Sequence, residues 1–315
     1  MSPNAALQND TFRLYVLIAS GILTTAGAAL TVLTWGLKKN VQSIWATYRG
    51  WLIMAPAVVL CILAGREAII VACTLVSILG LKEFARATGL YRDWWMTGSV
   101  YVAIIAVGIV TLVADPFRGQ PGWFGLFMTL PVYTIALLLM IPILRNRTQG
   151  QLQAVSLAIV GFIYIGWMFG HLGFLANSNH ALGYLLFLIF AVQLSDVTAF
   201  TVGKFFGRRQ LRSHISPNKT WEGALGALGV SMALPWVLGF SFPHFGPVQR
   251  VLTGLIVGIG GQLGDLSISF IKRDLGIKDM GATIPGHGGI LDRIDSLIFV
   301  APLFLHMVNY FYGLQ

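Results

Sequence analysis

Long apolar runs recur along almost the whole chain, and they constrain the fold more than any other feature. The hydrocarbon core of a bilayer is about 30 Å thick, so a helix needs about 20 mostly apolar residues to cross it. Ten runs reach or approach that length, near residues 12–36, 51–64, 67–82, 98–114, 122–144, 154–176, 181–203, 222–240, 250–272 and 294–313. The pattern predicts an all-α integral membrane protein, a polytopic bundle of about ten transmembrane helices.

The second and third runs are short, and only Arg66-Glu67 separates them. Two soluble helices of about 14 residues are therefore an alternative for this part of the chain. Composition favours a membrane for the chain as a whole, because 56% of its residues are hydrophobic and 10% are charged. A soluble domain carries about 25% charged residues.

The net charge of +9 would suit nucleic-acid binding in a soluble protein. No long basic, aromatic-interleaved soluble segment is present to carry such binding, so we expect no nucleic-acid partner. The basic residues are instead expected close to the headgroups of the lipid bilayer.

The distribution of basic residues predicts the orientation in the membrane. When the connections between runs are numbered in order, the side with the odd-numbered connections carries seventeen Lys and Arg residues. The opposite side carries four, which are Arg13, Arg66, Arg118 and Arg250. Since cytoplasmic loops carry an excess of basic residues, we expect an inner-membrane protein with its odd connections in the cytoplasm and both termini outside.

Acidic residues are concentrated in the last third of the chain. Seven of the twelve fall between positions 196 and 295, and they are Asp196, Glu222, Asp265, Asp274, Asp279, Asp292 and Asp295. The first half has no comparable cluster. We therefore divide this single membrane unit into N-terminal transmembrane helices (1–150) and a catalytic transmembrane region (151–315).

Two of these carboxylates, Asp196 and Asp265, lie inside apolar runs. A carboxylate at membrane depth is costly, so it needs a cation, a hydrogen-bond donor or a water-filled cavity. Function at a polar site is one interpretation, and a structural hydrogen bond between helices is the other.

The segment His214–Gly223, with the sequence HISPNKTWEG, follows a basic stretch. Thr220 can cap the next helix and Glu222 lies in its first turn. A helix N-terminus beside Lys219 is suited to binding phosphate. Capping and the orientation rule would also explain many of these residues, so the segment does not identify a function by itself.

The segment Ser269–Ser296 is the most informative. It combines basic side chains, four carboxylates and the turn Pro285-Gly286-His287-Gly288-Gly289. Glycines let the backbone approach a phosphate and present its N–H groups. Carboxylates suit Mg²⁺, which usually shares its ligand shell with substrate phosphates, and Arg and Lys neutralise the remaining phosphate charge. The segment predicts metal-assisted phosphate chemistry.

The pattern from Ser269 through Asp295 resembles the signature of phosphatidate cytidylyltransferases, the CDP-diacylglycerol synthases. Ser195-Asp196, the segment Ser216–Gly223 and the segment Gly261–Leu266 are also similar to that family. The resemblance covers residues 150–315 well. Ile268 stands where family members commonly have Glu, and there is an additional N-terminal helix, so the chain resembles a divergent paralogue group.

The resemblance implies that CTP and phosphatidate react to CDP-diacylglycerol and pyrophosphate in phospholipid biosynthesis. It implies a polar funnel open to the cytoplasm and to one leaflet, Mg²⁺ with room for a second cation, and a homodimer. We assign the metal to Asp265 and Asp279, with Asp292 and Asp196 as further ligands. The expected catalytic residues are Lys219, Lys272, Arg273, His287 and Arg293. The expected substrate-binding residues are Ser216, Asn218, Lys219, Thr220, Glu222, Lys278, Gly286, Gly288 and Gly289.

Alternatives remain open at this point. His287 could donate to a phosphate or only shape the turn. Ile268 keeps open a related transferase that acts on phosphatidate or another lipid phosphate with a different nucleotide or nucleotide-sugar donor. An ion-coupled transporter using Asp196 and Asp265 would predict inverted repeats in both halves, whereas the polar cluster lies in one half and on one side.

Overall fold

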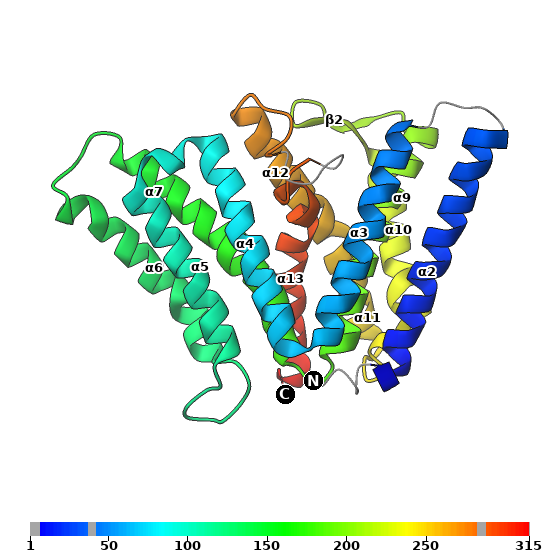
Figure 1. Cartoon of the computed structure of the whole chain (residues 1–315), viewed down its shortest axis with the longest axis horizontal. Coiled ribbons are helices and arrows are strands. Elements are labelled where there is room, and N and C mark those ends of the chain that lie inside the picture. The colour runs from blue at the N-terminus through cyan, green and yellow to red at the C-terminus, as the bar shows by residue number, and fades with distance from the viewer. Residues whose placement is uncertain (1–6, 37–41, 282–287, 315) are drawn as a thin grey trace.

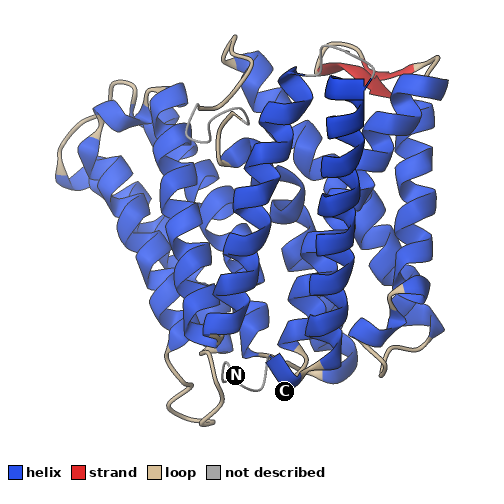
Figure 2. Cartoon of the chain, turned by 45° about the vertical axis from the view of Figure 1, so that its right-hand side comes forward, coloured by secondary structure: helices blue, strands red, loops and turns tan. Residues whose placement is uncertain are grey.

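The protein is a bundle of helices that run side by side between two ends, with a small sheet at one end (Figures 1 and 2). The computed structural model describes residues 7–36, 42–281 and 288–314. In chain order the elements are α2 (Asp10–Thr31), η1 (Val32–Gly36), α3 (Gln42–Ala64), α4 (Arg66–Thr88), η2 (Leu90–Arg92), α5 (Trp94–Leu112), α6 (Phe124–Leu144), α7 (Gln151–Val160), η3 (Gly161–Met168), α8 (Phe169–Phe174), η4 (Leu175–Asn177), α9 (Ala181–Phe206), β1 (Gln210–Arg212), β2 (Ser216–Thr220), α10 (Trp221–Val237), η5 (Gly239–Ser241), α11 (Pro247–Leu255), η6 (Ile256–Gly260), α12 (Gly261–Asp274) and α13 (Leu291–Tyr312).

The prediction of an all-α, polytopic membrane protein is confirmed. Within the described ranges, nine spans are long and apolar enough to cross a bilayer. The remaining predicted run, 222–240, forms α10, which has 17 residues. Strand structure in the described residues is limited to the antiparallel pair β1–β2.

The boundaries predicted for the second and third runs are wrong, because both helices are longer than their apolar cores. α3 and α4 have 23 residues each. α3 begins at Gln42, and α4 continues past Lys82 to Thr88. Lys, Glu, Arg and Gln are good helix formers, so a helix continues through them although they end the apolar signal. The alternative of two short soluble helices is therefore not supported.

Three spans change helix type along their length, and the first, Asp10–Trp35, passes from α2 into η1. Residues 151–177 pass from α7 through η3 into α8 and η4, and residues 247–274 pass from α11 through η6 into α12. Both η3 and η6 are π-helical. Segments with π geometry are frequent near functional sites, and η6 leads directly into the helix that carries Asp265.

The ends of the bundle differ in what they hold (Figure 1). The start of α2 and the end of α13 lie at one end, and the β1–β2 hairpin and the end of α12 lie at the other. The odd-numbered connections therefore share the hairpin end.

Two of the four basic residues predicted for the opposite end bind the ends of helices. Arg66 donates to the carbonyl oxygens of Thr111 (3.1 Å) and Leu112 (2.8 Å) at the end of α5. Arg250 donates to the carbonyl oxygen of Phe245 (3.2 Å) and lies over the ring of Trp236. These arginines are held by partners within the protein, which explains why they stand at the end of the bundle where few basic residues are expected.

α13 is the central helix, and α2 lies at the edge of the bundle (Figure 1). In their most apolar windows, 61% of α13 is buried against 6% of α2. α13 packs most extensively on α12, where glycine allows close approach. A Cβ atom on Gly264 would lie 2.8 Å from the Cα of Ser296. This contact sets how near Asp265 and Asp295, the neighbours of these residues, come to each other.

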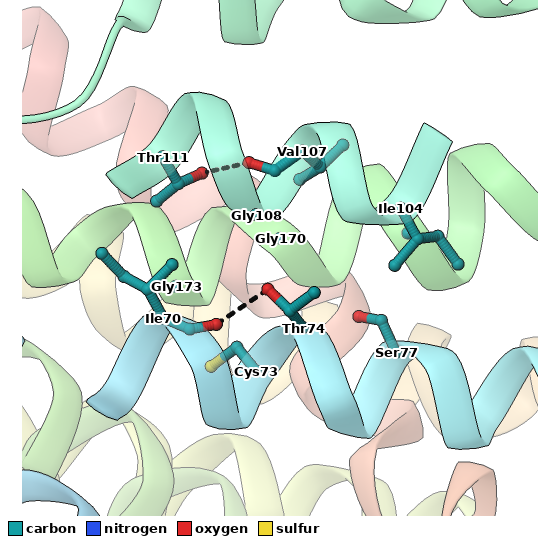
Figure 3. A pocket seen from close by; sticks show the side chains of 11 residues that line it. Ile70, Cys73, Thr74, Ser77, Ile104, Val107, Gly108, Thr111, Gly170 and Gly173 are labelled. Carbon is teal, nitrogen blue, oxygen red and sulfur yellow. Dashed lines mark hydrogen bonds between the residues drawn. The ribbon is translucent and has the colours of Figure 1, made fainter. Parts of the chain in front are cut away.

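A small cavity between α4, α5 and the span 151–177 reflects similar close packing (Figure 3). Its volume is about 10 Å³, which is room for about one water molecule and far too little for a substrate. The hydroxyls of Thr74 and Thr111 donate to carbonyl oxygens of their own helices, those of Ile70 (2.8 Å) and Val107 (2.7 Å). The cavity is a packing feature of the helices.

We predict that Gly264→Ala destabilises the protein by about 1–3 kcal/mol, because the added methyl group must push α12 away from the backbone of α13. Gly229→Ala in α10 is the matched control, since a Cβ atom there meets nothing within 4 Å. It should be neutral or stabilise by up to about 1 kcal/mol through helix propensity. Thermal unfolding of both variants in detergent tests this, and equal melting temperatures would contradict it.

Candidate active site

The predicted site residues gather at the hairpin end of the bundle, where β2, α9, α12 and the start of α13 meet (Figure 1). The first pair joins Lys219, at the end of β2, to Asp265 in α12. Lys219 Nζ lies 2.5 Å from Asp265 Oδ2, and the two side chains are 24% and 30% exposed. They are therefore partly accessible to a ligand.

Local capping explains how Lys219 is held. Thr220 caps α10 by accepting a hydrogen bond from the backbone N–H of Gly223 (3.1 Å), as predicted from the sequence. A Cβ atom on Gly223 would lie 3.1 Å from the Cα of Gly203 in α9. Close contact between α9 and α10 therefore fixes the end of β2 and the lysine on it.

Asp265 belongs to a group of three carboxylates from three helices. Asp196 in α9, Asp265 in α12 and Asp295 in α13 are near enough to repel one another electrostatically, and Lys219 attracts both Asp196 and Asp295. The hydroxyl of Ser296 donates to Asp196 (3.2 Å). The structure thus brings together two predicted metal ligands and adds Asp295, which the sequence analysis did not assign as a ligand.

A second ion pair stands at the start of α13. Lys272 Nζ lies 2.7 Å from Asp292 Oδ1, and these side chains are 13% and 9% exposed. The other oxygen of Asp292 accepts hydrogen bonds from the backbone N–H groups of Met280 (3.2 Å) and Gly289 (3.1 Å). Asp292 therefore joins α12, α13 and both ends of the connection between them.

Gly288 lies between two of the predicted metal ligands. Its φ of +79° is in the left-handed region, which favours glycine. A Cβ atom there would lie 3.3 Å from Asp292 Oδ2 and 3.8 Å from Asp279 Oδ1. Asp279 and Asp292 therefore approach the same point of the backbone. Because α13 places positions 292 and 295 on the same face, both groups of carboxylates border one region.

Other predicted residues have partners within the hairpin. Glu222 accepts hydrogen bonds from the backbone N–H groups of Arg208 (3.1 Å) and Arg209 (3.3 Å). Arg273 donates to the carbonyl oxygen of Ile215 (3.3 Å) and so ties the hairpin to α12. In this arrangement Glu222 and Arg273 hold the hairpin, and their predicted roles toward substrate remain predictions.

The remaining predicted residues are placed as follows. Ser216 pairs with Arg212 across the hairpin. Asn218, Lys278 and Arg293 are exposed at the same end of the bundle. Gly289 is buried. Gly286 and His287, for which roles were also predicted, lie outside the described residues.

The carboxylates are chemically suited to a hard cation, because they offer oxygen ligands with more negative charge than the neighbouring lysines balance. Within residues 7–36, 42–281 and 288–314, however, no group of three or more His, Cys, Asp or Glu side chains is close enough to hold a metal ion. Lysine amines occupy the positions nearest to Asp265 and Asp292 instead. The assignment of Mg²⁺ to these residues stays a prediction.

One buried acidic residue was missed by the sequence analysis. Glu83 in α4 is 5% exposed and accepts hydrogen bonds from the backbone N–H groups of Ile290 (2.9 Å) and Leu291 (3.1 Å). It belongs to the half of the chain in which no acidic cluster was found. The sequence did contain a signal for this residue. Among the acidic residues of the first half, Glu83 and Asp93 are those on the side of the odd-numbered connections, where the site was expected.

Comparison with known proteins shows to which family this chain belongs. The model of the cytidylyltransferase family matches residues 45–311. The phosphatidate cytidylyltransferase of Staphylococcus aureus (strain COL) is 33% identical over 246 residues, which are 77% of this chain and 90% of that protein. The same enzyme of Staphylococcus haemolyticus is 41% identical over 160 residues, 50% of this chain and 60% of that protein.

A third relative is the Escherichia coli K12 protein YnbB, described as uncharacterized. It is 32% identical over 242 residues, which are 75% of this chain and 77% of that protein. The match to the family model includes α4, the hairpin and the signature segment, and so extends well beyond the C-terminal region. The chain belongs to the cytidylyltransferase family.

Proposed function

We propose that this protein is a phosphatidate cytidylyltransferase, which converts CTP and phosphatidate into CDP-diacylglycerol and pyrophosphate. The observation that carries the proposal is the pairing of Lys219 with Asp265 and of Lys272 with Asp292 at one end of a membrane bundle. Such a place is accessible to both a lipid headgroup and a soluble nucleotide. The names of the staphylococcal relatives supply the substrates.

The depth of the site supports a lipid substrate. Phe205 and Phe206 at the end of α9 are 73% and 70% exposed, and Trp94 and Trp95 at the start of α5 are 71% and 63% exposed. Exposed aromatic side chains at helix ends are typical of the membrane–water interface. The lysine–carboxylate pairs at this end would therefore lie close to the level of phosphate headgroups.

In the reaction, an oxygen of the phosphatidate phosphate forms a bond to the α-phosphorus of CTP. The bond from that phosphorus to the bridging oxygen breaks, and pyrophosphate leaves with its electron pair. The attacking oxygen is already anionic at neutral pH, so no strong general base is required. The barrier is mainly repulsion between like charges, which positioning and charge neutralisation lower.

Each group at the site has a role in this scheme. Lys219 and Lys272 would neutralise phosphate charge, with Arg293 as a further exposed cation at the same end. Asp265 and Asp279 would bind Mg²⁺ together with the substrate phosphates, with Asp292 and Asp196 as further ligands and room for a second cation. Bound Mg²⁺ would supply additional neutralisation of the triphosphate. For His287 both alternatives stay open: it would either donate a hydrogen bond to a phosphate oxygen or only shape the turn.

The observations do not favour the other readings. Ile268 is fully buried in the apolar core, and the staphylococcal relatives are named phosphatidate cytidylyltransferases, which favours CTP as the donor. The polar groups lie at one end of the bundle, which is unlike an ion path through its middle.

The direct test incubates the purified protein with phosphatidate, Mg²⁺ and labelled CTP, and separates the lipid products. CDP-diacylglycerol and equimolar pyrophosphate are expected with CTP, and a panel of other nucleotides and nucleotide-sugars should give little product. A lipid product formed only with another donor would refute the proposal and support the related transferase.

We predict that Asp265→Asn and Asp279→Asn each lower turnover at least about 100-fold, because each removes charge that binds cations at the reacting phosphates. The control is Asp274→Asn, which changes an exposed carboxylate at the end of the same helix and should retain activity. Turnover is measured across a range of Mg²⁺ concentrations. Near-normal activity of either variant at limiting Mg²⁺ would remove that residue from the metal site.

We further propose that the hairpin end faces the cytoplasm of a bacterial inner membrane. Single cysteines introduced by His214→Cys and Asn179→Cys, with Cys61 and Cys73 replaced by Ala, test this orientation. A membrane-impermeant maleimide should label the Asn179→Cys variant in spheroplasts and the His214→Cys variant only after permeabilisation. The reverse labelling pattern would invert the proposed topology.

A further inference from the structure

Glu83 lies far from the signature segment in the sequence but contacts it directly. Its helix, α4, belongs to the first half of the chain, whereas its hydrogen-bond partners Ile290 and Leu291 lie at the start of α13. The side chain is 5% exposed, and a buried carboxylate is costly unless hydrogen bonds stabilise it. The two backbone N–H groups of α13 stabilise this buried carboxylate, which indicates a specific role at this contact.

The start of α13 needs a cap from outside its own sequence. The N-cap residue is Ile290, whose side chain has no atom that can accept a hydrogen bond. α5 and α10 are instead capped by their own Asp93 and Thr220. Because the first N–H groups of a helix lack partners within it and carry partial positive charge, an anion there is stabilising. Glu83 supplies this anion from another helix.

Glu83 also touches both ends of the glycine-rich connection. A Cβ atom on Gly281 would lie 2.7 Å from one carboxylate oxygen of Glu83, and a Cβ atom on Gly289 would lie 2.6 Å from the other. The same atom on Gly289 would lie 2.9 Å from the backbone nitrogen of Gly281. The two ends of the connection therefore meet on this carboxylate, and glycine at both ends leaves room for it.

Two carboxylates thus close the base of the connection. Asp292 binds the N–H groups of Met280 and Gly289, and Glu83 binds those of the next two residues, Ile290 and Leu291. Asp292 and Asp295 follow within the first turn of α13. Whether these two carboxylates face the site depends on the residue at which α13 begins and on the rotation of the helix about its axis.

We propose that Glu83 is a positioning residue of the active site, which fixes the start of α13 and holds Gly281 beside Gly289 so that Asp292 and Asp295 face the reacting phosphates. This inference rests on the proposed function for its effect on turnover. The contact itself does not depend on the identity of the substrates. Glu83 acts through the backbone of α13 and touches no substrate.

The test compares Glu83→Gln with Asp93→Asn. The amide of Gln has one oxygen acceptor, so its NH₂ group would face a backbone N–H from which it cannot accept a hydrogen bond. Asp93 is the matched control, since it is also an acidic cap on this side of the bundle and binds Arg145 at 2.7 Å. If Glu83 positions the site, kcat of Glu83→Gln falls about 10–100-fold while KM for CTP and for phosphatidate changes less than about threefold. Asp93→Asn should keep kcat within about threefold at a similar loss of melting temperature.

Hydrogen–deuterium exchange separates this inference from the proposed function. Backbone amides of residues 288–296 should exchange faster in Glu83→Gln than in the native protein, and those of residues 97–112 should be unchanged. This readout holds even if the native protein makes no CDP-diacylglycerol, an outcome that would refute the proposed function alone. Unchanged exchange at 288–296, or unchanged kcat, would overturn the positioning role.

A loss of kcat that follows melting temperature equally in both variants would show a merely structural role and would also overturn the inference. If Glu83→Gln is not recovered from membranes, Glu83→Asp decides by the same measurements. It keeps the charge but is one methylene group shorter, so it cannot reach both N–H groups. Exchange at 288–296 and kcat at native levels in Glu83→Asp would refute the proposal.

Discussion

Compensation of negative charge at the end of the bundle is the constraint on which the rest of this structure depends. Carboxylates at or near membrane depth are costly without a cation or a donor. Asp265 meets this requirement through Lys219, and Asp292 through Lys272 and two backbone N–H groups. These partners come from β2, α12 and the α12–α13 connection, so the same contacts that neutralise the carboxylates also tie these elements together.

Such an arrangement suits a reaction between two anions. Phosphatidate and CTP both bring negative charge, and a site that holds lysines and carboxylates close together can exchange these internal pairs for pairs with phosphate and cations. The two ion pairs differ in accessibility, because the side chains of Lys219 and Asp265 are partly exposed and those of Lys272 and Asp292 are nearly buried. The Lys219–Asp265 pair is thus the more accessible to a ligand, and the Lys272–Asp292 pair the more important for the shape of the site.

Sequence reasoning predicted most of the fold, since apolar length and charge asymmetry depend on the bilayer and need no knowledge of tertiary contacts. It failed where helices continue through polar residues, as α4 does from Lys82 to Thr88. It also predicted Thr220 as the cap of α10, which the structure confirms. Asp196 and Asp265, which it assigned to one metal site, come near each other, and their role as ligands stays a prediction. The specific lysine partners could not be predicted, because they depend on the approach of α12 to β2 and α13.

Glu83 shows why part of the site was missed. A single acidic residue at the end of an apolar run is common in membrane helices, and nothing in its neighbours marks it. Its importance comes from α13, whose N-cap residue Ile290 cannot cap itself, and this deficiency is visible only when the start of that helix is known. The start of α13 therefore depends on a carboxylate that the signature segment does not contain. The division into an N-terminal half and a catalytic C-terminal region describes where the acidic residues are concentrated, but the active site requires contact between both.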